Sequence, residues 1–352
     1  MRAHEERFEP KDGPLRAVVK ESVEAYLGCG QLLGGFARIR CPKCRGEHLL
    51  AFSCRTRNFC PSCQAKRAAL LSEHLEGVLA RVPHRHWVFT IPRALRALFA
   101  RERSLLSLLP RCAFAAVGRH LRERPGRKDG VPGFVGSIQT FGSAIPFHPH
   151  VHALATDGLL AREGEFVPLE PDVRAVEERF RRLVIAALAR AERLSEEFAL
   201  TLLSWERSGF SVYAEQVVLA EEKARLARLA RYVARAPLPD ARVREGPDGR
   251  LLVRTGPGEV AFSPLELIHA LSQQIPDRGQ HLVRYYGAYA NRAQALPRRA
   301  RGRRGARGRA PPLLGAADAE AARGRSPPVP EVRRRVASLR LGSRDTISHD
   351  AA

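Results

Sequence analysis

The sequence predicts an α+β protein with an N-terminal cysteine module, a core in which helices flank an antiparallel sheet, and a disordered basic C-terminal tail. Three observations lead to this class. Two Cys-x-x-Cys pairs lie within the first 63 residues, short apolar strands alternate with longer helical stretches after residue 82, and the last 62 residues are rich in Arg, Gly and Pro. We therefore expect three regions that span residues 1–81, 82–290 and 291–352.

Length and composition favour a folded, basic protein. A chain of 352 residues of which 44% are apolar is long enough to bury a sizeable core. The formal net charge of +22 predicts a polyanionic partner, either nucleic acid or a membrane surface. The chain has no run of about 18 uncharged apolar residues, and its charged start differs from a signal peptide. We therefore expect a soluble intracellular protein that binds nucleic acid and no membrane.

The spacing of four cysteines predicts a structural zinc site. Cys41 and Cys44 form one Cys-x-x-Cys turn, and Cys60 and Cys63 form a second one after fifteen intervening residues. Each such turn supplies two thiolates, and two turns complete the tetrahedron that Zn²⁺ prefers. An odd count of seven cysteines in an intracellular chain argues against disulfides.

The remaining cysteines leave the ligand set partly open. Cys54 lies near the second pair and could replace one of the assigned ligands, whereas Cys29 and Cys112 have the character of lone buried or helical thiols. Residues 36–40 and 48–52 are expected to form short strands on either side of the first pair.

Basic residues crowd both cysteine pairs, which favours a DNA-binding surface over a purely structural role. The residues that we assign to this surface are Lys43, Arg55, Arg57, Lys66 and Arg67. A second basic segment is the tail, residues 291–352, with fifteen Arg against five acidic residues. It has no apolar period and is predicted to be disordered, either binding phosphates without reading sequence or forming a solvated end with no selected role.

Two histidines on one predicted strand form a candidate metal site. Side chains alternate along a strand, so His150 and His152 project to the same side while Val151 faces the opposite layer. Imidazole is a common ligand of divalent metals, although the histidines of an isolated His-x-His can also be ordinary polar surface residues. The third ligand stays open between Gln139, on the preceding predicted strand, and His148.

The predicted elements of the core follow from periodicity and turn signals. Residues 242–245 and 251–254 flank Asp248-Gly249 and predict a hairpin, and Ser263 begins a helix with a capping box. The other strands are expected at residues 86–91, 134–141, 150–156 and 210–214, and helices at 64–79, 94–121, 173–198 and 221–235.

Several separated motifs, in order, resemble a known family. Residues 40–44, 52–55 and 59–63 look like the zinc-binding domain of rolling-circle insertion-sequence transposases, the IS-ninety-one-like family. Residues 82–92 resemble the first core strand that follows this domain, and residues 139–144 with the histidine strand resemble the family's HUH element, two histidines around one apolar residue. The resemblance extends from about Leu27 to about Tyr289.

The resemblance implies a single-strand DNA endonuclease and strand transferase of the HUH superfamily, with a tyrosine nucleophile and Mg²⁺ or Mn²⁺ at the histidines. Tyr232 lies in Arg231-Tyr232-Val233-Ala234-Arg235-Ala236-Pro237, which is similar to the family's tyrosine segment. On a helix, Arg228, Tyr232 and Arg235 share one face, where guanidinium groups would favour the phenolate and hold phosphate oxygens. Mg²⁺ or Mn²⁺ at His150, His152 and Gln139 would polarise the phosphate.

One position departs from the two-tyrosine members of this family. They carry a second tyrosine four residues earlier, where this chain has Arg228. Tyr285 and Tyr289 keep the same spacing and are alternative nucleophiles, unless they pack a terminal element and stack a DNA base.

Other functions explain fewer of these features. A non-catalytic or decayed zinc-binding DNA-binding protein accounts for the cysteines and the charge. A metallohydrolase lacks an acidic ligand set near the histidines, and a tyrosine recombinase lacks a tyrosine well beyond His281-Leu282-Val283-Arg284. We therefore expect a transposase of the bacterial cytosol or nucleoid that binds single-stranded DNA at transposon ends and target, with a homo-oligomer as a further possibility.

Overall fold

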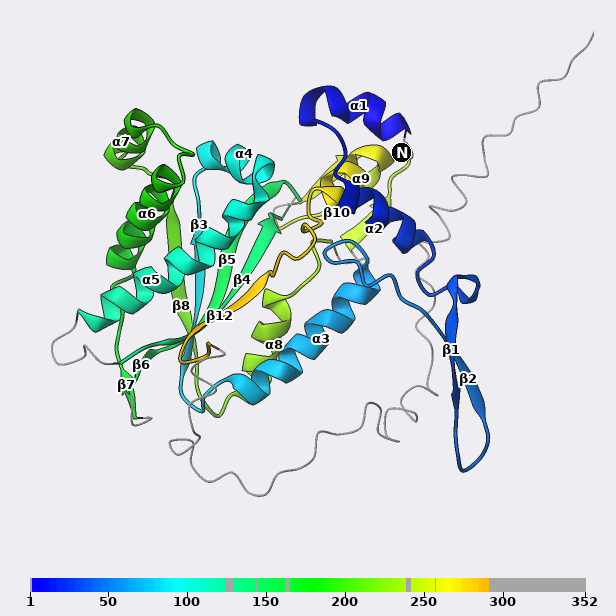
Figure 1. Ribbon diagram of the computed structural model, residues 1–352, viewed down its shortest axis with the longest axis horizontal. Helices are drawn as coiled ribbons and strands as arrows, with labels where there is room; N and C mark the ends of the chain where they lie inside the picture. Colours follow the sequence, from blue (N-terminus) through cyan, green and yellow to red (C-terminus); the bar gives the residue numbers. More distant parts are fainter. Residues whose placement is uncertain are drawn as a thin grey trace, which may run out of the picture. The chain divides into compact units, whose positions relative to one another are not determined.

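The computed structural model describes residues 2–123, 130–143, 145–161, 165–238, 242–256 and 258–290 (Figure 1). The predicted basic tail, residues 291–352, lies outside the described residues. The helices are α1 (Arg2–Asp12), α2 (Ala17–Leu27), η1 (Leu32–Gly34), α3 (Pro61–Val78), α4 (Arg93–Arg101), η2 (Arg103–Ser107), α5 (Leu108–Arg122), α6 (Val173–Arg190), α7 (Glu196–Ser204), α8 (Lys223–Val233) and α9 (Pro264–Ser272). The strands are β1 (Phe36–Arg40), β2 (Glu47–Ala51), β3 (His84–Thr90), β4 (Gly133–Phe141), β5 (Phe147–Thr156), β6 (Gly158–Leu160), β7 (Phe166–Pro168), β8 (Ser211–Val218), β9 (Val243–Glu245), β10 (Leu251–Arg254), β11 (Glu259–Phe262) and β12 (Val283–Gly287).

A five-stranded antiparallel sheet forms the centre of the fold. Its strand order is β12-β4-β5-β3-β8, and every neighbouring pair is antiparallel. Helices α4, α5 and α6 lie against one face, and α3 and α8 lie on the other side (Figure 1). The predicted α+β class with an antiparallel sheet flanked by helices is therefore confirmed.

Strand β5 is buried on both faces, and its two faces differ in chemistry. Val151, Ala153 and Ala155 join the main hydrophobic core under α5 and α6. On the opposite face, His150 and His152 are followed by Leu154, which packs into the smaller core under α3 and α8. The alternation of a strand therefore places the two histidines on the side of the sheet that faces α8.

Local sequence signals set the ends of several elements. Asp172 caps α6 by accepting a hydrogen bond from the Ala175 amide, and Ser263 and Glu266 form the predicted capping box of α9. Strands β9 and β10 pair as the predicted hairpin, with Gly249 at a φ of 73° in its turn.

Two of the predicted helices are wrong in extent. The stretch 94–121 divides into α4, η2 and α5, because Pro110 has no amide hydrogen and fits only in the first turn of a new helix. The stretch 173–198 divides where α6 ends and Ser195 caps α7 by accepting from the Phe198 amide. None of the described helices is both long and apolar enough to cross a membrane.

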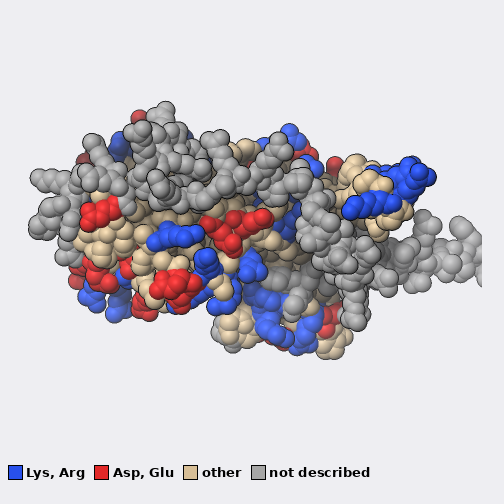
Figure 2. All heavy atoms as spheres, turned by 90° about the horizontal axis from the view of Figure 1, so that it is seen from below, with Lys and Arg blue, Asp and Glu red and all other residues tan. Residues whose placement is uncertain are grey.

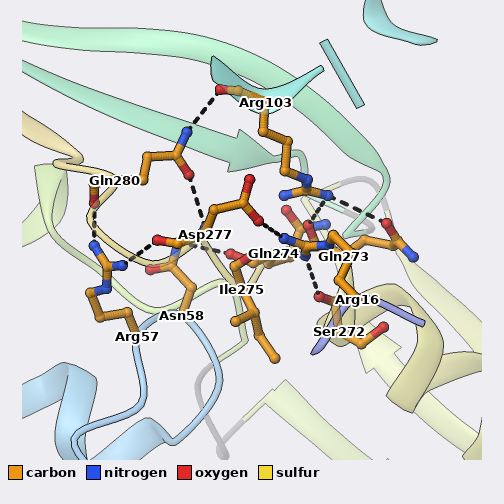
Figure 3. A network of polar contacts seen from close by, with 10 residues as sticks. All are labelled: Arg16, Arg57, Asn58, Arg103, Ser272, Gln273, Gln274, Ile275, Asp277 and Gln280. Atoms are coloured by element: carbon orange, nitrogen blue, oxygen red, sulfur yellow. Dashed lines mark hydrogen bonds and ion pairs between the residues drawn. The ribbon is translucent and has the colours of Figure 1, made fainter. Parts of the chain in front are cut away.

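A polar network joins the cysteine module to the core (Figure 3). Arg57, just before the second cysteine pair, donates to the backbone carbonyls of Asp277, at 2.8 Å, and Gln280. Asn58 donates to the Gln274 carbonyl at 3.2 Å, and Arg103 donates to the Gln273 carbonyl at 2.8 Å. The loop after α9 is therefore held from two sides by side chains distant in sequence.

Arg57 therefore has a structural role in this network. Its half-buried guanidinium donates to two backbone carbonyls, whereas the neighbouring Arg55 is exposed. The sequence did not predict this role, because the loop that packs over Arg57 is distant along the chain, and its contact with DNA stays a prediction.

We expect Arg57→Ala to destabilise the fold by about 1–3 kcal/mol, because it leaves two partly buried carbonyls without their donor. Urea unfolding monitored by circular dichroism measures this change. Arg55→Ala removes the same charge at an exposed position and is the control, with an expected change within about 0.5 kcal/mol. Equal stability of the two variants would contradict the assignment of Arg57 to the network.

Candidate functional site

Four cysteines from two segments meet in one cluster. The sulfur atoms of Cys29, Cys54, Cys60 and Cys63 all lie within 4.8 Å of one another. The Cys54–Cys63 separation is 3.5 Å, and Cys29 lies 3.9 Å from both Cys60 and Cys63. Tetrahedral Zn–S bonds of about 2.3 Å place neighbouring sulfur atoms about 3.8 Å apart, so the spacing fits a zinc tetrathiolate.

The electrostatics of this cluster also suit a cation. Hydrogen bonds, the largest from Cys60, lower the pKa of Cys54 to about 4, and the same contact raises the pKa of Cys60. The backbone amide of Cys54 donates to the Cys29 sulfur at 3.3 Å. Further thiolates at this spacing need a positive ion between them.

The predicted zinc ligand set is corrected in two of its four members. Cys60 and Cys63 belong to the cluster, but their partners are Cys29 and Cys54 instead of Cys41 and Cys44. The physical reason is the β1–β2 hairpin, whose five paired residues carry Cys41 and Cys44 to its tip, about 16 Å along the strand from its base. Cys29 and Cys54 flank that base, where Gly30 and Phe52 are hydrogen-bonded at 2.9 Å.

Cys112 is a lone buried thiol, as predicted. It packs in the main core on α5, and burial raises its pKa to about 11. A neutral thiol at this position acts as a small apolar side chain.

A second cluster, of three histidines, lies on the face of the sheet under α8. Nε2 of His150 lies 3.1 Å from Nε2 of His152, and Nδ1 of His152 lies 3.0 Å from Nε2 of His86 on β3. Burial lowers the pKa of His86 and His150 to about 4 and that of His152 to about 2. All three rings are therefore neutral near pH 7 and keep a lone pair for a ligand.

The hydrogen bonds around these rings suit a divalent cation. Nδ1 of His150 donates to its own strand at the His148 carbonyl, 2.7 Å away, which leaves Nε2 as the nitrogen with the lone pair. Two ligands at right angles on bonds of about 2.1 Å lie about 3.0 Å apart, close to the observed His150–His152 separation. If Nε2 of His152 binds, its Nδ1–H donates to His86, which then orients the ring.

Gln139 lies beside His150 in the β4–β5 register. Its Nε2 donates to the Val233 carbonyl at 2.8 Å, and its Oε1 is buried with no hydrogen-bond partner among the described residues. A buried acceptor without a donor is costly, so this oxygen fits the third ligand that two imidazoles leave open.

Tyr232 lies next to the histidine cluster. Its ring is perpendicular to that of His152 with centroids 5.5 Å apart, and it lies 6.4 Å from the ring of His86. The guanidinium of Arg235 stacks over the phenol ring at 4.2 Å. The side chain is 42% exposed, so the phenol is open to a substrate while its ring borders the candidate metal ligands.

The end of α8 is held to the sheet by three side-chain donors. Ser137 and Gln139 both donate to the Val233 carbonyl, at 3.1 and 2.8 Å. Gln64, on α3, donates to the Ala234 carbonyl at 2.8 Å. The last carbonyls of a helix lack partners within it, so these donors fix the turn that carries Tyr232.

The histidines of β5 and Tyr232 line one cavity of about 560 Å³. Its lining includes His148, His150 and His152 from β5, Tyr232 and Arg235 from the end of α8, and Arg242 and Arg254 from the β9–β11 region. Tyr232 and two of the metal-ligand candidates, His150 and His152, therefore face the same space.

Comparisons with known proteins agree with this architecture. Residues 1–91 match the family described as the transposase zinc-binding domain, and residues 133–296 match the family described as putative transposase. The chain belongs to the IS-ninety-one-like transposases. It is 27% identical over 317 residues to the transposase for insertion sequence element IS801 of Pseudomonas savastanoi pv. phaseolicola, covering 82% of this chain and 75% of that protein.

A second relative of this transposase is the putative transposase y4qJ of Sinorhizobium fredii. The two are 29% identical over 287 residues, which cover 74% of this chain and 71% of the relative. No solved structure matches the chain.

The structure separates the alternative tyrosines of the transposase from this cavity. Tyr289 is 1% exposed, and its hydroxyl contacts Nε2 of His84 at 2.6 Å and accepts from the Ala80 amide at 3.1 Å. Tyr285, on β12, is half-buried and packs edge-on against His74. Both contribute to the smaller core between α3, α8 and the sheet, so their positions suit packing.

The predicted arginines of the transposase differ in placement. Arg235 lines the cavity and lies over the rings of Tyr232 and Phe141. Arg228 is exposed on α8, one turn before Tyr232, and is not among the cavity-lining residues. The helix ends at Val233, so Arg235 leaves the helical face that Arg228 shares with Tyr232.

The basic surface predicted around the cysteines is exposed except at Arg57. Lys43 lies at the hairpin tip, and Arg55, Lys66 and Arg67 lie near the second cysteine pair and the start of α3. Figure 2 shows Lys and Arg side chains gathered along the lower middle and at the right end of one face. Their contact with DNA stays a prediction.

His86, Arg242 and Arg254 were not predicted as site residues from the sequence. His84 and His86 have the same one-residue spacing as the β5 pair, and this signal could have placed His86 on the same face of the sheet. Arg242 and Arg254 gave no such signal, because only folding brings the β9–β11 region to the end of β4.

Zinc content after dialysis should separate the two possible ligand sets. We expect Cys29→Ser to lose most of its zinc and to unfold at lower temperature, because three thiolates leave the tetrahedron open. Cys41→Ser should retain its zinc, since its sulfur lies at the hairpin tip. Loss of zinc from Cys41→Ser but not from Cys29→Ser would instead support the ligand set predicted from the sequence spacing.

Proposed function

We propose that this transposase cleaves and rejoins single-stranded DNA through a 5′-phosphotyrosine link to Tyr232. The observation that carries the proposal is the common cavity, in which the exposed phenol of Tyr232 adjoins His152 and the stacked Arg235. A nucleophile and the groups that bind a phosphate must reach the same phosphate group. Tyr232, His152 and Arg235 are neighbours in this cavity and meet that requirement.

In the cleavage step, Oη of Tyr232 attacks a phosphorus of the bound strand. A bond between Oη and phosphorus forms, the bond from phosphorus to the 3′ oxygen breaks, and the leaving oxygen takes a proton from solvent while the phenol proton passes to solvent. Arg235, stacked on the phenol ring, is placed to donate to the non-bridging oxygens. The free 3′ hydroxyl can later attack a phosphotyrosine or a target junction, so no nucleotide hydrolysis is needed.

The candidate ligands for a divalent cation are His150, His152 and Gln139, with His86 orienting His152. Bound Mg²⁺ or Mn²⁺ would polarise a non-bridging phosphate oxygen and stabilise the leaving 3′ oxygen. The protein's own part is to hold neutral imidazoles in place, since their burial keeps them unprotonated near pH 7. Zinc at the cysteine cluster is structural in this proposal.

Adduct formation tests the nucleophile. Incubation of the protein with a labelled single-stranded end oligonucleotide and Mn²⁺ should give a covalent adduct that survives denaturing electrophoresis. We expect Tyr232→Phe to reduce its rate by about a thousandfold or more, because no other oxygen nucleophile replaces the phenol. The matched control is Tyr285→Phe, which removes the same hydroxyl from a packing position.

An unchanged adduct in Tyr232→Phe, or its loss in Tyr285→Phe alone, would reassign the nucleophile. If the unaltered chain binds DNA but forms no adduct, the alternative of a non-catalytic or decayed zinc-binding DNA-binding protein would replace the proposal.

Mn²⁺ binding can be measured without catalysis by the loss of the free-ion signal in electron paramagnetic resonance. We expect His150→Ala to weaken Mn²⁺ binding at least about tenfold, because it removes one of two nitrogen ligands. His281→Ala, at an exposed position, is the control. Equal Mn²⁺ affinity in the two variants would move the metal site away from β5.

A further inference from the structure

The cavity has a second wall that the proposed chemistry does not use. One wall carries the histidines and Tyr232, and another is formed by Arg242, Arg254, Thr255 and Gly256 next to Ser143. The second wall belongs to the end of β10 and the segment before β9, so it comes from a sheet separate from the five-stranded one.

The charge of the lining is one-sided. Among the described residues, three arginines and three histidines line the cavity, and no Asp or Glu does. Among the described residues of the small sheet, Arg244 pairs with Glu259 at 2.5 Å. Glu259 is also the register partner of Arg254 and interacts with its charge, but neither Arg242 nor Arg254 lies within ion-pair distance of a described carboxylate. A concave site whose charged side chains are arginines concentrates a polyanion.

The guanidinium of Arg242 is held in place by hydrogen bonds to two backbone carbonyls. Its Nε donates to the Arg254 carbonyl at 2.7 Å, and an Nη donates to the Ser143 carbonyl at 2.8 Å. These bonds tie the end of β10 to the turn after β4, so the second wall has a defined position against the first.

On the first wall, buried Nε of Arg235 and buried Nε2 of His148 have no hydrogen-bond partner among the described residues. The unpaired Nε–H of Arg235 on one wall and the guanidinium groups of Arg242 and Arg254 on the other point to a ligand with anionic oxygens.

We infer that Arg254, held beside Arg242, binds the DNA backbone at a phosphate next to the one that Tyr232 attacks. This inference rests on the proposed function, because it assumes a single strand in the cavity. The contact is made to phosphate, so it should be independent of base sequence. The small β9–β11 sheet thereby acts as a clamp that keeps the strand in line with the nucleophile.

The test uses equilibrium binding in a chain that carries Tyr232→Phe, so that chemistry plays no part. Two labelled single-stranded oligonucleotides of unrelated sequence, each longer than a binding site of about 4–16 nucleotides, are titrated at several salt concentrations. We expect Arg254→Ala to weaken the binding of both about five- to tenfold at low salt and to reduce the slope of log affinity against log salt by about 0.7. Arg254→Lys should restore the slope, because it restores the charge.

Arg250→Ala is the matched control. Arg250 lies on the same small sheet and carries the same charge, but its guanidinium donates to the Ala261 carbonyl at 2.9 Å and does not line the cavity. The affinity of Arg250→Ala for the two oligonucleotides should change less than about twofold. Equal weakening by Arg250→Ala and Arg254→Ala would reduce the effect to general electrostatics and overturn the clamp. Unchanged affinity in Arg254→Ala would overturn it directly, whereas failure of the proposed function would appear separately, as the absence of a Tyr232 adduct.

Discussion

The anchoring of the C-terminal end of α8 is the contact on which the geometry of the site depends. Ser137 and Gln139 reach from β4 to the Val233 carbonyl, and Gln64 reaches from α3 to the Ala234 carbonyl. A helix end buried without such donors would leave carbonyls unpaired at a cost of about 1–3 kcal/mol each. Because Tyr232 directly precedes these two carbonyls, the bonds that stabilise the helix end also set the direction of the phenol.

The histidine cluster shows how a buried face can stay polar without losing stability. His150 is bonded to the His148 carbonyl, and His152 connects His150 with His86, so each ring has a polar neighbour. The opposite face of β5 is fully apolar and packs under α5 and α6. These contacts and the neutral state of the rings offset part of the free-energy cost of burying the imidazoles. The apolar face of β5 supplies the hydrophobic burial that stabilises the strand.

The sheet could be predicted from the sequence largely because its strands have a strong local signal, whereas the sites depended on contacts distant along the chain. Four of the five strands of the central sheet and the β9–β10 hairpin occur where alternation and the Asp248-Gly249 turn predict them, whereas β12 was not predicted. The zinc ligands were only half predicted, because pairing of β1 with β2 separates Cys41 and Cys44 from the second cysteine pair. The network around Arg57 was not predicted for a similar reason, since the loop that accepts hydrogen bonds from its guanidinium follows more than two hundred residues later. Local periodicity contains no information about such packing.

Gln64 connects the two parts of the molecule that the sequence alone treats as separate. It directly follows Cys63 in the first turn of α3, is 4% exposed, and accepts from the Asn58 amide at 3.1 Å while donating to Ala234. The cysteine cluster is therefore connected to Tyr232 through the peptide bond between Cys63 and Gln64, the side-chain amide of Gln64 and the C-terminal end of α8. A cluster that fixes the start of α3 also fixes the position of Gln64, and through it the last turn of α8. The cysteine module is thus part of the support of the site as well as a candidate surface for DNA, which gives a physical reason for its direct attachment to the core of this transposase.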